Sequence, residues 1–291
     1  MSSKEESILV GVIGGSGVYD LDGLTDVQEK EIDTPFGFPS DAIRCGKLNG
    51  IPVAFLPRHG RNHSFTPTAV PYRANIYALR SLGVQRLLSV SAVGSLCEEY
   101  APGDFVLVDQ FIDRTYRRVQ TFFDSSLVAH LPWAHPVCQD MVAVVTAAAK
   151  EIGVQSHQGG TYVCIEGPQF SSQAESELFR SWGAKIVGMT NGTESKLARE
   201  AGMSWCCIAM VTDYDCWHPD HDDVDVATVI ATAQANAKKV RGLVAASVPR
   251  IAALGLSPWP QVVAKSVMST EDHTPTKQLE ILKVLAGHTC N

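Results

Sequence analysis

The sequence predicts an α/β fold, a single domain in which helices flank a central mixed, mostly parallel sheet. Short apolar runs alternate with longer amphipathic segments along the chain, as they do where crossover helices join parallel strands. Glycine, hydroxyl or charged side chains directly follow several of the apolar runs. Ligands of open α/β sheets bind at the carboxyl ends of the strands, so these following segments form the predicted site.

The expected strands are short apolar runs bounded by turn residues. They span residues 8–13, 51–56, 86–91, 105–108, 161–165, 185–187 and 205–211. Apolar residues at helical spacing predict helices at residues 70–82, 137–152, 194–201 and 276–285. Ser171 or Ser172 can cap a further helix that ends at Trp182, since a side-chain oxygen there accepts from free backbone N–H groups.

The C-terminal part of the chain divides into a long helix and a tail. The amphipathic pattern of residues 226–254 is interrupted at Pro249, because proline lacks the N–H that an interior helical residue donates. Residues 257–260 read Ser-Pro-Trp-Pro and end the pattern. We therefore expect one domain over residues 1–256 and a tail with a terminal helix over residues 257–291.

Composition limits the partners and the cellular compartment. The 291 residues include 24 basic and 31 acidic side chains, for a net charge of −7, whereas nucleic-acid binding needs a basic face. The sequence shows neither a secretory leader nor an apolar run of membrane-spanning length. The eight cysteines show no Cys-x-x-Cys spacing, which favours reduced, buried thiols in a cytoplasmic protein.

Two carboxylates follow the most apolar strand. Asp213 and Asp215 come after residues 205–211, and in an extended chain residues two apart face the same side. Together they suit a ligand with adjacent protonated nitrogens, such as the N7 and 6-amino edge of adenine. A polar turn with a capping aspartate is the alternative interpretation.

Three loops after other strands suit an anion. Residues 14–17 read Gly-Gly-Ser-Gly, which lets backbone N–H groups and the Ser16 hydroxyl approach a ligand. Residues 58–63 contain two arginines and two histidines, and residues 89–95 add hydroxyls and a glycine. The three loops together would form a phosphate site without a metal. A tight turn and a solvated basic turn remain the alternatives for the first two.

Residues 218–223 contain two histidines and three aspartates, yet their irregular spacing does not predict a metal site. No cysteine lies in the electropositive setting that a nucleophilic thiolate requires.

Eight segments, taken in order, resemble the trimeric purine nucleoside phosphorylase family, and within it the branch that acts on 5′-methylthioadenosine. They are residues 13–17, 33–37, 58–60, 110–115, 165–168, 170–172, 188–190 and 212–217. The resemblance extends from about residue 8 to about residue 250 and implies the fold predicted above.

The resemblance also implies roles for individual residues. The residues implied to hold inorganic phosphate are Ser16, Arg58, His59, Ser91 and Thr190, with the backbone of Ala92. Met189 would lie along the ribose and Phe170 near the base. Asp213 would be the catalytic acid at N7, and Asp215 would accept from the 6-amino group.

The implied reaction is the reversible phosphorolysis of 5′-methylthioadenosine to adenine and 5-methylthioribose 1-phosphate. Phosphate is a co-substrate, and no cofactor or metal is expected. Val226, Val229 and Ile230 would line the pocket for the 5′-methylthio group, which His130 of a neighbouring subunit would close. The implied assembly is a homotrimer.

Specificity follows from Ser171 and the two aspartates. Family members that act on 6-oxopurines have Glu where this chain has Ser171, and Asn at the base. An ionised carboxylate accepts but cannot donate, so this site favours a 6-amino group. The apolar Val226 favours a thioether over a 5′-hydroxyl. Two departures from the family concern the ribose side: Gly188 replaces a common Asn, and residues 191–194 read Asn-Gly-Thr-Glu in place of a Val-Pro-Glu stretch.

Three other functions are alternatives: a phosphorylase for adenosine, methylthioinosine or another purine nucleoside; a nucleosidase that uses water; and a binding protein without catalysis. The preference for base and 5′-substituent distinguishes the first alternative from the phosphorolysis of 5′-methylthioadenosine. A phosphate site argues against the second, and an acid at the base edge is superfluous for the third.

Overall fold

The centre of the molecule is a buried set of parallel strands. The computed structural model describes residues 7–15, 23–123 and 126–287. Its central strands are β4 (Ile51–Pro57), β1 (Val10–Gly14), β5 (Arg86–Ser95) and β11 (Ser204–Asp213), which pair in this order in parallel. All ten residues of β11 are buried, which explains its continuous apolar sequence.

Further strands extend this centre into one sheet of 11 strands. The added strands are β2 (Leu24–Lys30), β3 (Ile43–Leu48), β6 (Phe105–Leu107), β7 (Gln110–Asp113), β8 (Ser156–Gln158), β9 (Thr161–Cys164) and β10 (Ala184–Gly188). The pairs β2·β3, β3·β4, β5·β10 and β6·β11 are antiparallel, and the remaining pairs are parallel. The prediction of a mixed, mostly parallel sheet is confirmed. Five residues of β2 are exposed, so its sequence carries no apolar pattern.

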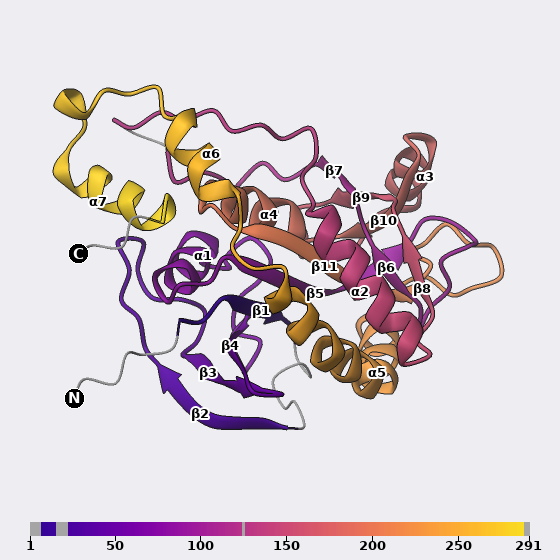
Figure 1. The fold of residues 1–291 in the computed structure, drawn as a ribbon. Coiled ribbons are helices and arrows are strands. Elements are labelled where there is room, and N and C mark those ends of the chain that lie inside the picture. The colour runs from indigo at the N-terminus through magenta and orange to yellow at the C-terminus, as the bar shows by residue number, and fades with distance from the viewer. Residues whose placement is uncertain (1–6, 16–22, 124–125, 288–291) are drawn as a thin grey trace.

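Helices cover both faces of the sheet (Figure 1). They are α1 (Tyr72–Ser81), α2 (Gln139–Glu151), α3 (Gln173–Ser181), α4 (Asn191–Glu200) and α5 (Val226–Ala253). Helix α1 packs against α4, and α2 packs against α5. Helix α3 begins at the capping box that Ser172 forms with Glu175, as the sequence indicates.

Helix α5 continues through Pro249, so the predicted interruption is wrong. Proline leaves the carbonyl four residues earlier without its helical donor. Here the Asn49 side chain donates to Ala245 O at 3.2 Å and replaces the missing N–H. The partner comes from a segment far away in the sequence, which local sequence patterns cannot reveal.

The C-terminal segment packs on the same hydrophobic core. It contains α6 (Trp259–Ser266), a short 3₁₀ helix (Glu271–His273) and α7 (Thr276–Leu285). Val263, Ile281 and Leu285 are buried members of the core, and α7 packs against α1. The sequence did not predict α6, because Pro258 and Pro260 were interpreted as a break, although proline is compatible with the first turn of a helix. The boundary after residue 256 stays a prediction.

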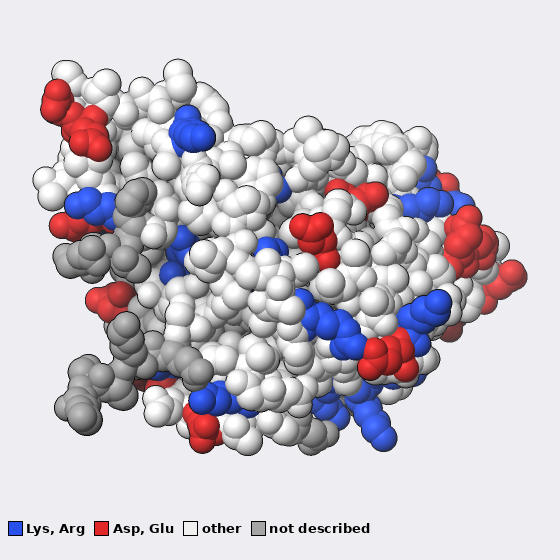
Figure 2. Space-filling model, viewed as in Figure 1, with Lys and Arg blue, Asp and Glu red and all other residues white. Residues whose placement is uncertain are grey.

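Charges of both signs are interspersed on the face shown in Figure 2. The seven cysteines of the described part of the chain are free thiols. Among the described helices, none combines the length and the apolar character that crossing a bilayer requires.

Candidate active site

The carboxyl ends of four neighbouring strands meet at one edge of the sheet. In the parallel order β4, β1, β5 and β11, Ile13 is level with both Leu56 and Ser89. Arg58 directly follows β4, and Asp213 ends β11. Side chains that are far apart in the sequence therefore converge at this edge, as expected for an α/β sheet.

Asp213 is a buried carboxyl group, 8% exposed. Thr212 Oγ1 donates to its Oδ2 at 2.6 Å, and the backbone N–H of Asp215 donates to its Oδ1 at 2.8 Å. Burial raises the pKa of Asp213 above its usual value, although the two hydrogen bonds oppose the shift. A carboxyl group with a raised pKa can act as a proton donor nearer to neutral pH.

Asp215 is also buried, and one of its oxygens lacks a partner. Within the described part of the chain, its Oδ2 and the buried hydroxyls of Ser171 and Ser176 lie near one another without meeting hydrogen-bond geometry. Burial raises the pKa of Asp215, the nearby serine hydroxyls lower it, and the charge of Asp213 raises it further. Buried polar atoms without partners are rare in native proteins and indicate a place for a ligand.

Arg58 is positioned by contacts within the protein. Its Nε lies 2.7 Å from Glu194 Oε2, and both side chains are almost fully buried. Its Nη1 donates to Val90 O at 2.9 Å, and its Nη2 donates to Ser89 Oγ at 2.7 Å. The position of Arg58 at this strand end was predictable, whereas its partner Glu194 lies 136 positions further along the chain and was not.

His59 is held as a neutral imidazole. Its Nδ1 lies 2.8 Å from Phe65 O, so this nitrogen carries the proton and Nε2 is the acceptor. Burial, followed by the charge of Arg58, lowers the pKa of His59 to about 4. The ring stacks on His63, with centroids 4.5 Å apart.

The remaining predicted phosphate residues lie at the ends of β5 and β10. Ser91 is buried and Ala92 is exposed within β5. Thr190 is buried at the N-cap of α4, where free N–H groups and the helix dipole favour an anion. Ser16 lies outside the described residues.

Arg118 and Glu166, which the sequence analysis gave no role, fix the backbone of Met189. Arg118 Nη1 donates to Met189 O at 2.5 Å, and its Nε lies 3.1 Å from Glu166 Oε1. Glu166 also accepts from the Thr68 hydroxyl.

The side chain of Phe170, which was predicted to lie near the base, is 37% exposed.

The segment after Met189 forms the first turn of α4. Asn191, Gly192, Thr193 and Glu194 are completely buried there. Replacing proline with this sequence therefore yields a packed helix start, and Glu194 supplies the carboxylate for Arg58.

The residues predicted for the 5′-substituent lie on the first turns of α5 and do not form an enclosed pocket within one chain. Val226 is 62% exposed and Ile230 is 49% exposed, whereas Val229 is partly buried. His130 is exposed in the segment beside α6, where its backbone N–H donates to Ser266 O at 3.0 Å.

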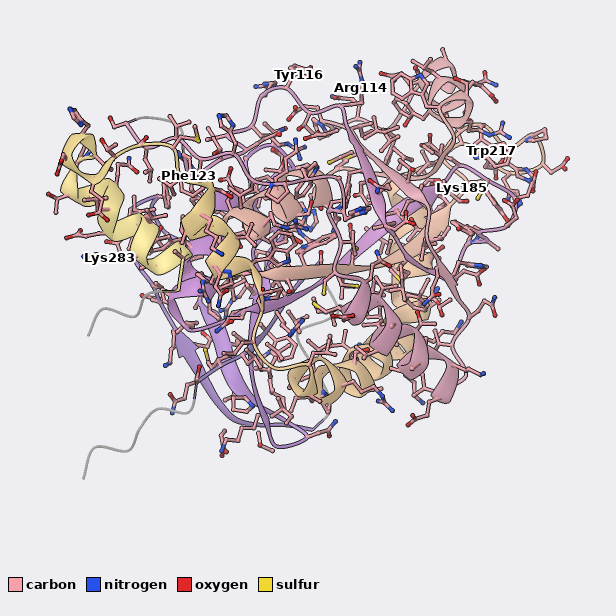
Figure 3. The ribbon with its side chains drawn as sticks, turned by 45° about the horizontal axis from the view of Figure 1, so that its top comes forward. Arg114, Tyr116, Phe123, Lys185, Trp217 and Lys283 are labelled. Atoms are coloured by element: carbon pink, nitrogen blue, oxygen red, sulfur yellow. The ribbon has the colours of Figure 1, made fainter. Side chains whose placement is uncertain are left out.

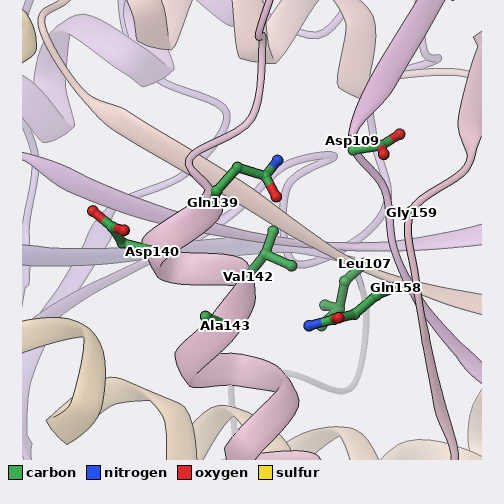
Figure 4. A pocket seen from close by; sticks show the side chains of 8 residues that line it. All are labelled: Leu107, Asp109, Gln139, Asp140, Val142, Ala143, Gln158 and Gly159. Atoms are coloured by element: carbon green, nitrogen blue, oxygen red, sulfur yellow. The ribbon is translucent and has the colours of Figure 1, made fainter.

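One cavity lies away from these residues. A hollow of about 540 Å³ lies between the start of α2 and the strands β6 and β8 (Figure 4). None of the predicted site residues lines it. Its volume is no argument for function, because the convergent buried polar groups lie at a different edge. Among the described residues, no group of three or more His, Cys, Asp or Glu is placed to hold a metal.

The model of the phosphorylase superfamily matches residues 9–249. The chain belongs to this superfamily. The match covers the central strands and every predicted site residue, and it confirms the family resemblance found in the sequence.

Individual superfamily members resemble the chain over nearly its full length. S-methyl-5′-thioadenosine phosphorylase of Cereibacter sphaeroides is 58% identical over 237 residues, covering 81% of this chain and 82% of the relative. The protein of the same name from Thermosynechococcus vestitus is 48% identical over 280 residues, covering 95% and 97%. A methylthioadenosine phosphorylase from an antarctic soil metagenomic library has a TM-score of 0.91 at 42% identity, covering 96% and 99%.

Proposed function

We propose that this phosphorylase cleaves 5′-methylthioadenosine with inorganic phosphate, releasing adenine and 5-methylthioribose 1-phosphate. The observation that carries the assignment is the buried carboxyl pair of Asp213 and Asp215, next to hydroxyls without partners. The named relatives act on the same nucleoside, and their similarity extends over most of this chain.

Asp213 is the proposed acid at the leaving base. Phosphate attacks C1′ as the C1′–N9 bond breaks, and the electrons of that bond pass to the purine. Asp213 donates its proton to N7, so the base leaves as neutral adenine. The phosphate dianion carries one proton, which is released to solvent when the sugar phosphate forms. Asp213 takes up a proton from solvent, so the reaction is balanced. Such general acid catalysis contributes roughly 10²–10⁴-fold in rate.

Asp215 and Ser171 are proposed to recognise the purine base. The free Oδ2 of Asp215 accepts from the 6-amino group, and the Ser171 hydroxyl supplies a further polar contact. A 6-oxopurine has no donor there, so binding it would leave a buried acceptor unpaired. The site should therefore favour adenine nucleosides over inosine.

His59 is proposed to orient the phosphate. Because its Nδ1 is bonded to Phe65 O, the neutral ring presents Nε2 as an acceptor for the hydroxyl of the phosphate dianion. Arg58, Ser91, Thr190, the backbone of Ala92 and Ser16 complete the proposed phosphate site. No step requires a cofactor or a metal.

A homotrimer is the proposed assembly, and the exposure of apolar side chains supports it. Tyr116 is 80% exposed, Val119 is 50% exposed and Val128 is 46% exposed, all in the segment that follows β7. Figure 3 shows Tyr116 and Arg114 at the periphery of the molecule. His130 belongs to the same segment, and from a neighbouring subunit it would close the open pocket at Val226. Such contacts would bury the apolar groups. A cytoplasmic location is proposed as well.

The decisive test is adenine release from 5′-methylthioadenosine with and without inorganic phosphate, with inosine and methylthioinosine as competing substrates. We expect release that depends on phosphate and a strong preference for the 6-amino compounds. Release without phosphate would identify a nucleosidase, and a preference for the 6-oxo compounds would refute the roles of Asp213 and Asp215.

A further inference from the structure

A fully buried tyrosine shares an acceptor with the phosphate-site threonine. The Tyr162 hydroxyl donates to Asn191 Oδ1 at 3.3 Å. The Thr190 hydroxyl lies at the same distance from the same oxygen. Tyr162 and Asn191 have no exposed surface, so solvent cannot replace the tyrosine hydroxyl as a donor to Asn191 Oδ1.

The amide nitrogen of Asn191 shares a hydrogen-bond acceptor with Arg58. Asn191 Nδ2 donates to Ser89 Oγ at 2.8 Å, and Arg58 Nη2 donates to the same hydroxyl oxygen at 2.7 Å. These contacts orient the amide so that Oδ1 faces the two hydroxyl groups. The amide therefore joins the residues implied for phosphate binding into one buried network.

Gly188 provides the space that the tyrosine occupies. A Cβ atom at position 188 would be 2.1 Å from the Tyr162 hydroxyl oxygen and 2.7 Å from its Cζ. The glycine on β10 thus leaves room for a tyrosine hydroxyl from the neighbouring strand β9. The departure at Gly188 and the presence of Tyr162 are one structural feature.

We propose that Tyr162 is a positioning residue of the phosphate site, because it keeps Asn191 Oδ1 hydrogen-bonded when the Thr190 hydroxyl turns to the phosphate. The inference rests on the proposed function. Without phosphate, both hydroxyls donate to Oδ1. With phosphate bound, the Thr190 hydroxyl donates its one hydrogen to the anion. Tyr162 is then the remaining hydroxyl donor to Asn191 Oδ1.

A buried hydrogen bond that is lost and not replaced costs free energy. If the tyrosine hydroxyl is removed, turning Thr190 toward phosphate leaves a buried carbonyl oxygen unpaired, which is unfavourable. Burial raises the pKa of Tyr162 well above its usual value, although the charge of Arg58 and a hydrogen bond with the Ser91 side chain oppose the shift. The hydroxyl therefore remains protonated throughout the physiological pH range. Phosphate affinity should therefore depend on a hydroxyl that does not touch phosphate.

The test is Tyr162→Phe with phosphate as the varied substrate and 5′-methylthioadenosine saturating. We expect KM for phosphate to rise about tenfold, equivalent to ~1.4 kcal/mol, while KM for the nucleoside changes less than about twofold. Tyr100→Phe is the matched control, because its hydroxyl donates to Gly159 O at 3.3 Å and to none of the site residues. A merely structural role of Tyr162 would change both KM values together, and this result would overturn the proposal.

A second comparison uses Thr190→Val. In that variant no hydroxyl has to turn away from Asn191, so adding Tyr162→Phe should leave phosphate affinity nearly unchanged. Phosphate affinity is measured without turnover, from the phosphate-dependent shift in thermal unfolding. A full tenfold loss in the Thr190→Val background would refute the shared-acceptor argument. If the unmodified enzyme turned over without phosphate, the proposed function would fail instead, and the two failures are thus distinguishable.

Discussion

Gly94 on β5 lies directly against the carboxyl group of Asp213 on β11. The two residues are level in the parallel pairing of these strands, and a Cβ atom at position 94 would be 2.8 Å from Asp213 Oδ1. The absence of a side chain on one strand thus allows the proposed acid to occupy its place on the next.

Gly94→Ala should therefore reduce catalysis by displacing the acid. We expect kcat/KM to fall by about 10–10²-fold, since a shift on the order of 1 Å is costly in a preorganised site. Gly242→Ala in α5 is the control, because its new Cβ would lie 3.8 Å from Ile152 Cδ1 at the end of α2, which is an ordinary contact distance. Steady-state kinetics of both variants check the expectation, which equal activities would contradict.

Asp213→Ala should be far more damaging than Val226→Ala. Loss of the acid should reduce kcat by roughly 10²–10⁴-fold, whereas trimming the largely exposed Val226 should cost less than about tenfold. Since the protonated form of Asp213 is the active one, kcat/KM should fall as pH rises through its raised pKa. Equal losses in the two variants would refute the assignment of Asp213.

Asp215→Asn should stabilise the protein at neutral pH. The folded-state pKa of Asp215 is raised, so the folded protein binds this proton more tightly and stability falls as pH rises through that pKa. Asparagine avoids the buried charge and tolerates the φ of 53° at this position. We expect a gain of about 0.5–2 kcal/mol in the free energy of unfolding at pH 7, disappearing below the unfolded-state pKa near ~3.9. Denaturant titrations at both pH values measure it, and a loss at pH 7 would contradict it.

His59 should make the protein sensitive to acid. Its folded-state pKa of about 4 lies below the ordinary value of 6.5, so the unfolded chain takes up a proton in this interval and the folded protein does not. Stability is fully present above pH 6.5 and is lost as pH falls toward 4. Compared with His59→Asn, the unmodified protein should lose up to about 1.4 kcal/mol more per pH unit. Parallel stability profiles would show that this histidine is not buried in its neutral form.

Arg58→Ala should destabilise the fold in addition to raising the phosphate requirement. Removal of the guanidinium leaves the buried Glu194 carboxylate without its partner, which costs about 3–5 kcal/mol. Arg61→Ala is the control, because the Arg61 side chain is half exposed and pairs with Asp41 at the surface, where such pairs contribute about 0–1 kcal/mol. Thermal unfolding without phosphate separates the structural effect from the binding effect, and similar melting temperatures for both variants would refute it.

The class of fold and the strand ends that carry the chemistry are predictable from the amino-acid sequence. Short apolar runs identified the central strands, because parallel strands that are buried on both faces have continuous apolar sequences. The aspartates at the end of β11 and the charged residues after β4 were recognised because strand ends in such sheets point to one edge. Strand β2 was not predicted, because an exposed edge strand has no apolar pattern. The continuation of α5 through Pro249 was not predicted either, because the donor to Ala245 O is Asn49, which is distant in the sequence.

Tertiary structure decided what each site residue contacts. Glu194 behind Arg58, the Phe65 carbonyl at His59 and the amide shared by Tyr162 and Thr190 are contacts between segments or turns whose relative placement no local pattern specifies. Burial also decided the protonation behaviour, since a low dielectric raises the pKa of Asp213 and lowers that of His59. The sequence specifies the residue types, but hydrogen-bond partners and solvent exposure are established only when distant segments pack together.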